Sequence, residues 1–543
     1  MARFLSKLKE LALRPFRYHF LFLVSFFVLA TSPDVIRQAF FLKQYMYAVI
    51  LFVHCFVVSY VVTFIVGLIG NNLLRKIVQT ILLIVFAVLF AMNIYCIFEL
   101  GGIFDKDYAL LVLETNPNEA REFASTMLPV KTILEVVLVY AVLITAWLWS
   151  RKHDFNLGKR ASVVALVLVL LGALYHLYNK NLWPISPVQR FIEYFQHYDV
   201  PSDLQSYYTH PEMTSDHEFQ KPENVILIIG ESFARFHSSL FGYEKMTNPR
   251  LGALRDQGLL FKFDSIDAPA PTTALALRYM LSLYDKSCTD KEKKWYEYTS
   301  LIEMMKSCGY DCYWFSTQAR GGIHDGTARV YAEACEQSWF LQKPGTSLGN
   351  NKTLDIELVT ASHGFVDTIA PGSHNFVVYH MMGSHFGYNM RYPAEYDKFQ
   401  ATEYSKYPEH QRAILAAYDN SLLYNDFVVD SLISLYRDKE SVIIYIPDHG
   451  QDLFRSSPNY CVHGKENNPV SYAYGVEVPF MIYLSPMYQQ RHPQVVERAV
   501  ASSRSVRPWN TEDLPYCILD LIGVTVVDNQ DVRQRSVLTG NQN

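Results

Sequence analysis

The chain has 543 residues, half of them apolar, and a net charge of −5 at pH 7. That length can hold two domains, and the small negative charge offers no basic footprint, so no nucleic-acid partner is expected. The apolar excess lies before about residue 180. This distribution indicates a membrane domain followed by a more polar domain.

Five apolar runs occupy the first part of the chain. They cover residues 18–31, 44–69, 77–98, 130–149 and 161–178. Four of them approach the roughly 20 residues that a spanning helix needs. The first is shorter and carries His19, so it is either a span or a signal-type segment. We predict a five-helix transmembrane domain over residues 1–180.

Basic side chains gather before the first run, between the second and third, and between the fourth and fifth. They are Arg3, Lys7, Lys9, Arg14 and Arg17, then Arg75 and Lys76, then Arg151, Lys152, Lys159 and Arg160. The positive-inside tendency assigns these segments to the cytoplasm and the acidic segment 99–129 to the other side. With five spans, everything after about residue 180 is expected outside the cytoplasm.

Residues 181–221 are predicted to be a connector, in which 187–198 could form a helix along the membrane surface. Beyond them, six cysteines fall in the exported part: Cys288, Cys308, Cys312, Cys335, Cys461 and Cys517. An even number in an oxidising compartment favours disulfides over free thiols. Their pairing is not readable from the sequence.

Residues 222–543 are predicted to form an exported α/β domain. Strand-like runs at 225–229, 312–316, 376–382, 441–446 and 479–484 alternate with helix-like stretches such as 300–307 and 411–435. This alternation is typical of a mainly parallel sheet with helices on both faces.

Three of the apolar runs end in metal-binding residue types. VILIIGE ends at Glu231, NFVVYHMMGSH at His385, and SVIIYIPDH at Asp448 and His449. Ligands of open α/β sheets gather outside the carboxyl ends of the strands. We therefore expect these side chains to converge on a catalytic metal.

Seven short motifs, in order along the chain, resemble those of the phosphoethanolamine transferases. They are ENVILIIGES at 223–232, FGYEKMTNP at 241–249, PTTALALRYMLS at 271–282, MGSHFGYNMRYP at 382–393, YDNSLLYND at 418–426, PDHG at 447–450 and HG at 463–464. That family belongs to the alkaline phosphatase and sulfatase superfamily. The resemblance covers nearly the whole chain and implies five N-terminal membrane helices with an exported catalytic domain.

The resemblance also implies roles for particular residues. Glu231, Asp448 and His449 fall on the family's zinc ligands, and Thr273 falls on the threonine that is both ligand and nucleophile. His385 and His463 match histidines that bind a further zinc or the phosphate group, so one or two zinc ions are expected. The two histidines could also be catalytic, acting on the leaving and entering oxygens. Zinc lowers the pKa of a bound hydroxyl and neutralises charge on a phosphoryl group, which fits these assignments.

Other matches are weaker or depart from the family. In the segment 104–120, Thr115 and Glu119 match positions that receive the phosphoethanolamine head group, although the segment could also be an amphipathic interfacial helix. Pro447 and Gln451 replace the family's usual neighbours of the Asp-His pair, and Arg320 stands in a segment that lacks the usual lysine. Thr272 is interpreted as a helix cap beside Thr273.

The expected function follows from this resemblance. A bacterial inner-membrane enzyme would move phosphoethanolamine from phosphatidylethanolamine, through Thr273, to an envelope glycolipid such as lipid A or a core sugar, with its catalytic domain in the periplasm. Two alternatives remain: a phosphoglycerol transferase of the lipoteichoic acid synthase kind, and a non-catalytic membrane lipid sensor.

Overall fold

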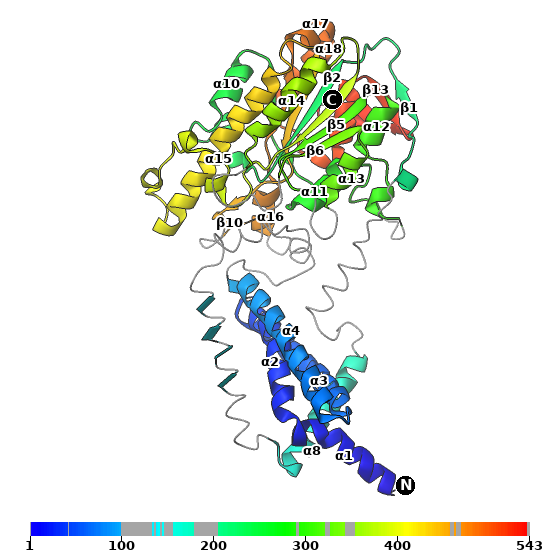
Figure 1. Cartoon of the computed structure of the whole chain (residues 1–543), viewed down its shortest axis with the longest axis vertical. Coiled ribbons are helices and arrows are strands. Elements are labelled where there is room, and N and C mark those ends of the chain that lie inside the picture. The colour runs from blue at the N-terminus through cyan, green and yellow to red at the C-terminus, as the bar shows by residue number, and fades with distance from the viewer. Residues whose placement is uncertain are drawn as a thin grey trace. The chain divides into compact units, whose positions relative to one another are not determined.

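The computed structural model describes residues 2–41, 43–98, parts of 133–145, 156–178, 205–288, 293–320, 326–342, 353–456, 461–462 and 469–539. These residues fall into two compact units, a helical one up to residue 178 and an α/β one from residue 205 (Figure 1). The segment 187–198 and most of the run 130–149 lie outside the described residues.

The described helical unit consists of long helices, which are apolar except for the amphipathic α1. They are α1 (Ala2–Tyr18), α2 (Phe20–Ile36) with a π-helical end (Arg37–Phe41), α3 (Tyr45–Gly67), α4 (Asn72–Phe98) and α8 (Lys159–Tyr178). Among the described helices, α3 and α4 are long and apolar enough to cross a membrane, and the pair α1 and α2, bent by 70°, adds a third if it is one span. The region is thus of membrane type, whereas five spans stay a prediction.

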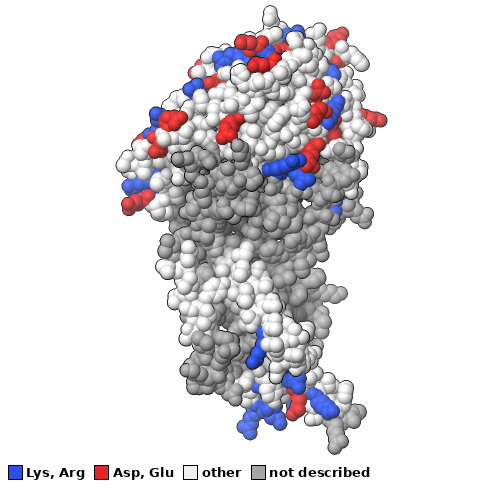
Figure 2. Space-filling model, viewed as in Figure 1, with Lys and Arg blue, Asp and Glu red and all other residues white. Residues whose placement is uncertain are grey.

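The described parts of the three basic segments lie at one end of this unit. The backbone N–H of Leu157, just before α8, donates to the carbonyl of Phe16 in α1 at 3.0 Å. A side chain at Gly67, where α3 ends, would lie 3.2 Å from the His19 ring. Lys and Arg side chains gather at that end while the helix flanks are nearly bare of charge (Figure 2). This clustering is what the charge rule requires of segments on one membrane face.

The α/β unit is built on a seven-stranded sheet. Its order is β3 (Leu260–Phe263), β11 (Phe480–Leu484), β8 (Ser441–Pro447), β2 (Asn224–Gly230), β7 (Asn375–His380), β5 (Asp311–Ser316) and β6 (Gln337–Phe340). The pairs from β8 to β6 are parallel, and β11 runs antiparallel to both β8 and β3. The sheet is therefore mixed, with β11 alone reversed among these seven strands.

Helices cover both faces of the sheet, because its central strands are apolar on both sides. Along β2, Val225, Leu227 and Ile229 face one core, and Ile226 and Ile228 face the other. The first core contains α11 (Thr273–Met280), α12 (Leu301–Ser307), α13 (Thr327–Glu333), α18 (Pro493–Ser503), α19 (Leu514–Leu521) and α20 (Val532–Arg535). The second contains α10 (Pro249–Asp256), α14 (Ile356–Thr368) and α15 (Glu409–Ser434).

Smaller elements complete the unit. They are a three-stranded sheet of β1 (Met213–Ser215), β13 (Val524–Val527) and β14 (Gln530–Asp531), the pairs β9 (Asp452–Leu453) with β10 (Cys461–Val462) and β4 (Ile266–Asp267) with β12 (Trp509–Asn510), and the helices α16 (Pro469–Val476) and α17 (Pro486–Arg491). Strand β1, inside the predicted connector 181–221, pairs with β13. That part of the connector thus packs into the α/β unit.

The expected disulfides are not formed among the cysteines that the structure describes. Cys288, Cys308, Cys312, Cys335 and Cys517 are free thiols, and the side chain of Cys461 lies outside the described residues. Cys308, Cys312 and Cys517 belong to the first core. Burial raises the pKa of the Cys308 thiol to about 11, which makes it unreactive. The predicted disulfides are thus not shown for these residues, and core packing accounts for the burial of Cys308, Cys312 and Cys517.

Candidate active site

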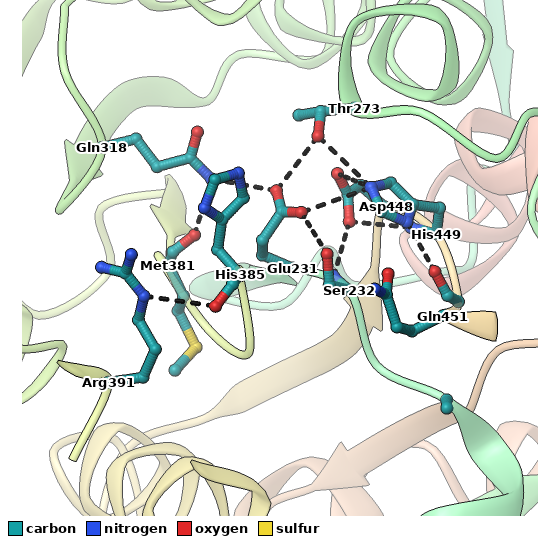
Figure 3. Close-up of polar contacts among 12 residues, drawn as sticks. Glu231, Ser232, Thr273, Gln318, Met381, His385, Arg391, Asp448, His449 and Gln451 are labelled. Carbon is teal, nitrogen blue, oxygen red and sulfur yellow. Dashed lines mark hydrogen bonds and ion pairs between the residues drawn. The ribbon is translucent and has the colours of Figure 1, made fainter. Parts of the chain in front are cut away.

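The predicted ligands lie together at the carboxyl ends of β2 and β8. The two strands pair in parallel, with Gly230 opposite Pro447, so the residues that follow, Glu231 and Asp448, emerge side by side (Figure 3). The backbone N–H of Asp448 donates to the Gly230 carbonyl at 3.1 Å. Parallel pairing alone thus places two carboxylates at one point of the sheet edge.

Glu231, Asp448 and His449 form a compact group whose ligand atoms all lie within 4.8 Å of one another. His449 Nε2 is 3.3 Å from Glu231 Oε1 and 3.6 Å from Asp448 Oδ2. All three side chains are at most 1% exposed. Two carboxylates buried this close are stable only with a positive charge between them or a proton on one of them.

Thr273 completes the group from the first turn of α11. Its hydroxyl donates to Glu231 Oε2 at 3.1 Å and lies 3.4 Å from His449 Nε2. The first backbone N–H groups of a helix lack intrahelical acceptors, and the helix dipole favours negative charge at this end. Thr272 occupies the N-cap position, as predicted, but its side chain makes no capping hydrogen bond and its buried hydroxyl has no partner.

The backbone beside Glu231 is held in an uncommon conformation. Ser232 has φ of 54°, a region that disfavours residues with a Cβ. Three contacts hold it there: its N–H donates to Asp448 Oδ1 at 3.2 Å, its hydroxyl to Glu231 Oε1 at 2.7 Å, and its carbonyl accepts from Tyr418 at 2.7 Å. A strained backbone conformation that is fixed by several neighbouring contacts is typical of functional sites.

Two glycines allow loops to pass close to the ligands. At Gly383 φ is 51°, and a Cβ would lie 2.7 Å from the backbone nitrogen of Glu231. At Gly450 a Cβ would lie 2.6 Å from the carbonyl oxygen of Tyr474. Any side chain at either position would push a ligand-bearing segment aside.

The protonation of the group follows from its burial and mutual charge. Burial and the neighbouring Glu231 charge raise the pKa of Asp448 to about 8. Burial would lower the pKa of His449, but Asp448 and Glu231 overcome it and raise that pKa to about 9. Burial also opposes ionisation of Glu231, yet its hydrogen bond with His449 holds its pKa well below the ordinary range.

The donor set fits a zinc ion. His449 Nδ1 lies 2.6 Å from the Gly450 carbonyl, which can only accept, so Nδ1 donates a proton to it. A metal would take the place of the proton on Nε2, which faces the two carboxylates. Asp448 Oδ2 is buried and accepts no hydrogen bond. Two carboxylate oxygens and one imidazole nitrogen, with room for one more ligand, are a donor set of catalytic zinc sites.

His385 lies on the loop after β7, close to the group (Figure 3). Its carbonyl accepts from Arg391 Nε at 3.3 Å, and its buried Nδ1 has no hydrogen-bond partner in the described part of the chain. Burial lowers its pKa to about 4, so the ring is neutral at pH 7. His380 lies on β7 itself, where its Nδ1 is 3.1 Å from the Ser316 hydroxyl.

Two residues of the site were missed from the sequence. Gln318 donates through Nε2 to Glu231 Oε2 at 3.2 Å and to the Met381 carbonyl at 2.9 Å. Asp355 accepts from the backbone N–H groups of Met382 and Gly383, both at 2.8 Å, and from Thr317. Gln318 ties the loops after β5 and β7 to Glu231, and Asp355 joins those two loops to each other. No sequence signal marked Asp355, and the segment holding Gln318 was noted only for Arg320.

The remaining predicted residues fall into two groups. Arg320 is exposed and pairs with Glu333 at 3.4 Å, and Gln451 donates to the Tyr388 hydroxyl at 2.9 Å, so neither touches the ligand group. Thr115, Glu119 and His463 lie outside the described residues.

Comparison with known proteins gives the family. The sulfatase family profile matches residues 223–524, more than half of the chain, and the profile "Phosphoethanolamine transferase EptA/EptB" matches residues 58–206. Phosphoethanolamine transferase EptC of Escherichia coli K12 is 25% identical over 77% of this chain and 76% of its own. Phosphoethanolamine transferase CptA of Salmonella typhimurium is 26% identical over 80% and 78%.

Solved structures agree. The C-terminal periplasmic domain of the E. coli EptC protein, in complex with Zn, has 25% identity and a TM-score of 0.53 over 62% of this chain and 91% of its own. The integral membrane protein EptA of Neisseria meningitidis shares the fold, with a TM-score of 0.67 at 17% identity over 96% of this chain and 98% of its own. The chain therefore belongs to the sulfatase family and, within it, to the phosphoethanolamine transferases, which are enzymes.

Proposed function

We propose that this protein is an inner-membrane transferase that moves phosphoethanolamine from phosphatidylethanolamine to an envelope glycolipid, lipid A or a core sugar, through Thr273. The observation that carries this proposal is the placement of the Thr273 hydroxyl at a helix N-terminus, 3.1 Å from Glu231 Oε2 and 3.4 Å from His449 Nε2. A hydroxyl held against two metal-ligand residues is the arrangement of an activated nucleophile.

In the first step, the oxygen of Thr273 forms a bond to phosphorus, and the bond from phosphorus to the diacylglycerol oxygen breaks. In the second, a hydroxyl of the acceptor attacks the same phosphorus and releases Thr273. A zinc ion held by Glu231, Asp448 and His449 would lower the pKa of the hydroxyl and neutralise phosphoryl charge. The N-terminal N–H groups of α11 point toward the same charge and stabilise it.

The remaining assignments extend the same proposal. His385 and His463 are proposed to bind the phosphoryl group or a second zinc, and the orphaned Nδ1 of His385 supports this for one of them. Thr115 and Glu119 are proposed to receive the head group, Glu119 by pairing with its ammonium. Five spans over residues 1–180 would place the domain 222–543 in the periplasm, and the basic segments gathered at one end of the helical unit support that topology.

Mass spectrometry of the purified full-length protein after incubation with phosphatidylethanolamine tests the proposal. We expect a phosphoethanolamine adduct on a peptide containing Thr273, and none in Thr273→Ala. An adduct formed only with phosphatidylglycerol would identify a phosphoglycerol transferase instead. No adduct with either lipid, together with no bound zinc, would identify a non-catalytic sensor.

A further inference from the structure

An arginine is fixed between two aromatic rings a short way beyond the metal ligands. The Arg455 guanidinium carbon lies 4.2 Å from the centre of the Phe236 ring and 4.6 Å from the centre of the Tyr474 ring. The two rings meet at 66°, so they form a wedge that contains the guanidinium. Contact with two rings restricts this long side chain to one position.

The turn that presents Arg455 is fixed as well. Asp452 Oδ1 accepts the backbone N–H groups of Arg455 and Ser456, both at 3.1 Å, and Asp452 Oδ2 accepts the Ser471 hydroxyl at 2.7 Å. Phe454, between them, has φ of 61°. A buried carboxylate with several donors therefore holds a strained turn, which packs Phe454 against the second core and fixes the position of Arg455.

All three parts of the wedge are connected to the metal ligands. Phe236 follows Glu231 on the same loop, whose Phe233 N–H donates to the His449 carbonyl at 3.0 Å. Tyr474 belongs to α16, where the Gly475 carbonyl accepts the Gly450 N–H at 2.7 Å. Helix α16 and the β9–β10 pair lie together beyond the carboxyl ends of the sheet (Figure 1). Arg455 thus lies at the rim of the candidate active site.

The charge of Arg455 has no carboxylate partner within the described part of the chain. Its side chain is exposed and packs against the two rings. Arg235, on the same loop as Phe236, differs in pairing with Glu477 and Asp264. A rigid, exposed and unpaired guanidinium offers two parallel N–H donors, the geometry that binds phosphate in bidentate fashion.

We propose that Arg455 binds a phosphate group of the acceptor glycolipid and so holds the acceptor hydroxyl at Thr273. This inference rests on the proposed transferase function and adds to it the chemistry of the acceptor: a phosphorylated sugar is preferred over the same sugar without phosphate. The donor half of the reaction does not involve Arg455.

The test compares the full-length wild type with Arg455→Gln and Arg455→Lys, and with Arg437→Gln as control, because Arg437 is exposed but pairs with Asp430 near the amino ends of the strands. Each enzyme is given phosphatidylethanolamine with either lipid A carrying its phosphates or the dephosphorylated lipid. Two readouts are taken: the Thr273 adduct without acceptor, and KM and kcat with each acceptor.

We expect Arg455→Gln to raise KM for the phosphorylated acceptor about tenfold, the scale of one charge-assisted contact, with kcat, the adduct and KM for the dephosphorylated lipid unchanged. Arg455→Lys should recover part of the loss, and Arg437→Gln should match wild type. Equal KM changes for both acceptors, no change for either, or a wild-type enzyme that forms the adduct but transfers to neither would overturn the inference. Absence of the adduct in the wild type would instead reject the proposed function itself.

Discussion

The two ends of the parallel strands differ in whether their buried polar groups have hydrogen-bond partners. At the amino ends of β2, β7 and β8, such groups satisfy one another. Asn224 donates through Nδ2 to the Glu440 carbonyl at 3.1 Å, and Asn375 donates to Asn224 Oδ1 at 3.4 Å. The carboxylate of Glu440 accepts from His492 at 3.2 Å and from Arg491. None of these side chains leaves a buried polar atom without a partner in the described residues.

At the carboxyl ends, buried polar atoms are left over. Asp448 Oδ2, His385 Nδ1 and His380 Nε2 are buried and have no hydrogen-bond partner among the residues that the structure describes. An unsatisfied buried polar group costs about 1–3 kcal/mol. The buried polar groups named above are hydrogen-bonded at the amino ends of the strands, and these three atoms at the carboxyl ends are not. The carboxyl ends are therefore suited to bind a ligand, which here is proposed to be a zinc ion and a phosphoryl group.

The largest effect is expected from Thr273→Ala. Because the hydroxyl forms the covalent bond to phosphorus, transfer should fall by about 10⁴-fold or more. The side chain is small and caps nothing, so the apparent Tm should stay within about 1 °C of the wild type. Enzyme assays and thermal scans measure both. Thr273→Ser, which keeps a hydroxyl, should recover part of the activity, and its failure to do so would argue against a nucleophilic role.

Removal of metal should weaken the carboxyl end and change its response to pH. At a free zinc concentration a thousand times Kd, bound zinc stabilises by about 4 kcal/mol, and a chelator should remove this. In the chelated protein, burial and Glu231 raise the pKa of Asp448 to about 8, so ionising it opposes folding. Asp448 and Glu231 raise the pKa of His449 to about 9 against burial, so protonating it favours folding.

Both shifts have the same sign. The raised pKa values of Asp448 and His449 mean that the folded state binds both protons more strongly than the unfolded state does. The stability that protonated His449 contributes is lost as pH rises through about 9. The Tm of the chelated protein should therefore rise between pH 9 and pH 6. The gain from zinc should shrink over the same range, because protons compete with the metal. A chelated protein that lost stability in this window would contradict the assigned charges.

Gly383→Ala should disturb the ligands through the backbone. The substitution puts a Cβ 2.7 Å from the Glu231 nitrogen at φ of 51°. We expect a loss of about 3 kcal/mol or more, together with weaker zinc binding, because strain and steric displacement add. Gly372→Ala is the matched control: φ there is 82°, but nothing lies within 4 Å. That variant should lose only about 1 kcal/mol and keep its zinc.

The smallest effect is expected at Gln318. Replacing it with Leu removes the hydrogen bonds to Glu231 Oε2 and to the Met381 carbonyl. Loss of such a supporting contact typically weakens metal affinity by about 10- to 100-fold. Competition with a zinc chelator measures this without relying on activity. Arg320→Ala, close by on the same segment but paired with half-buried Glu333, should bind zinc as the wild type does.

The central strands could be predicted from the sequence because they are apolar throughout. The run 225–229 became β2, 441–446 became β8 and 376–382 became β7, which ends at His380. The direction of each strand in the sheet could not be predicted, because a strand buried on both faces has the same apolar pattern whether it runs parallel or antiparallel to its neighbours. The reversed direction of β11 was therefore not foreseen. Strands β3 and β6 were missed because each has four residues and no long apolar run.

The site was predictable where a ligand follows a strand directly, as Glu231, Asp448 and His449 do. Thr273 begins a helix, so its place beside Glu231 was expected from the family resemblance and not from strand ends. Gln318 and Asp355 were missed because each acts across loops, on Glu231 and on the Met382 and Gly383 amides. Contacts of that kind depend on how loops from separate strands meet, which local sequence patterns do not encode.

The most direct test of the contrast between the two strand ends is the zinc content of three full-length proteins after dialysis against a weak chelator. We predict that the wild type retains zinc, that Asp448→Asn loses it because a carboxylate is missing from the carboxyl end, and that Glu440→Gln at the amino end retains it. A wild type without zinc, or Asp448→Asn holding as much zinc as the wild type, would contradict the account.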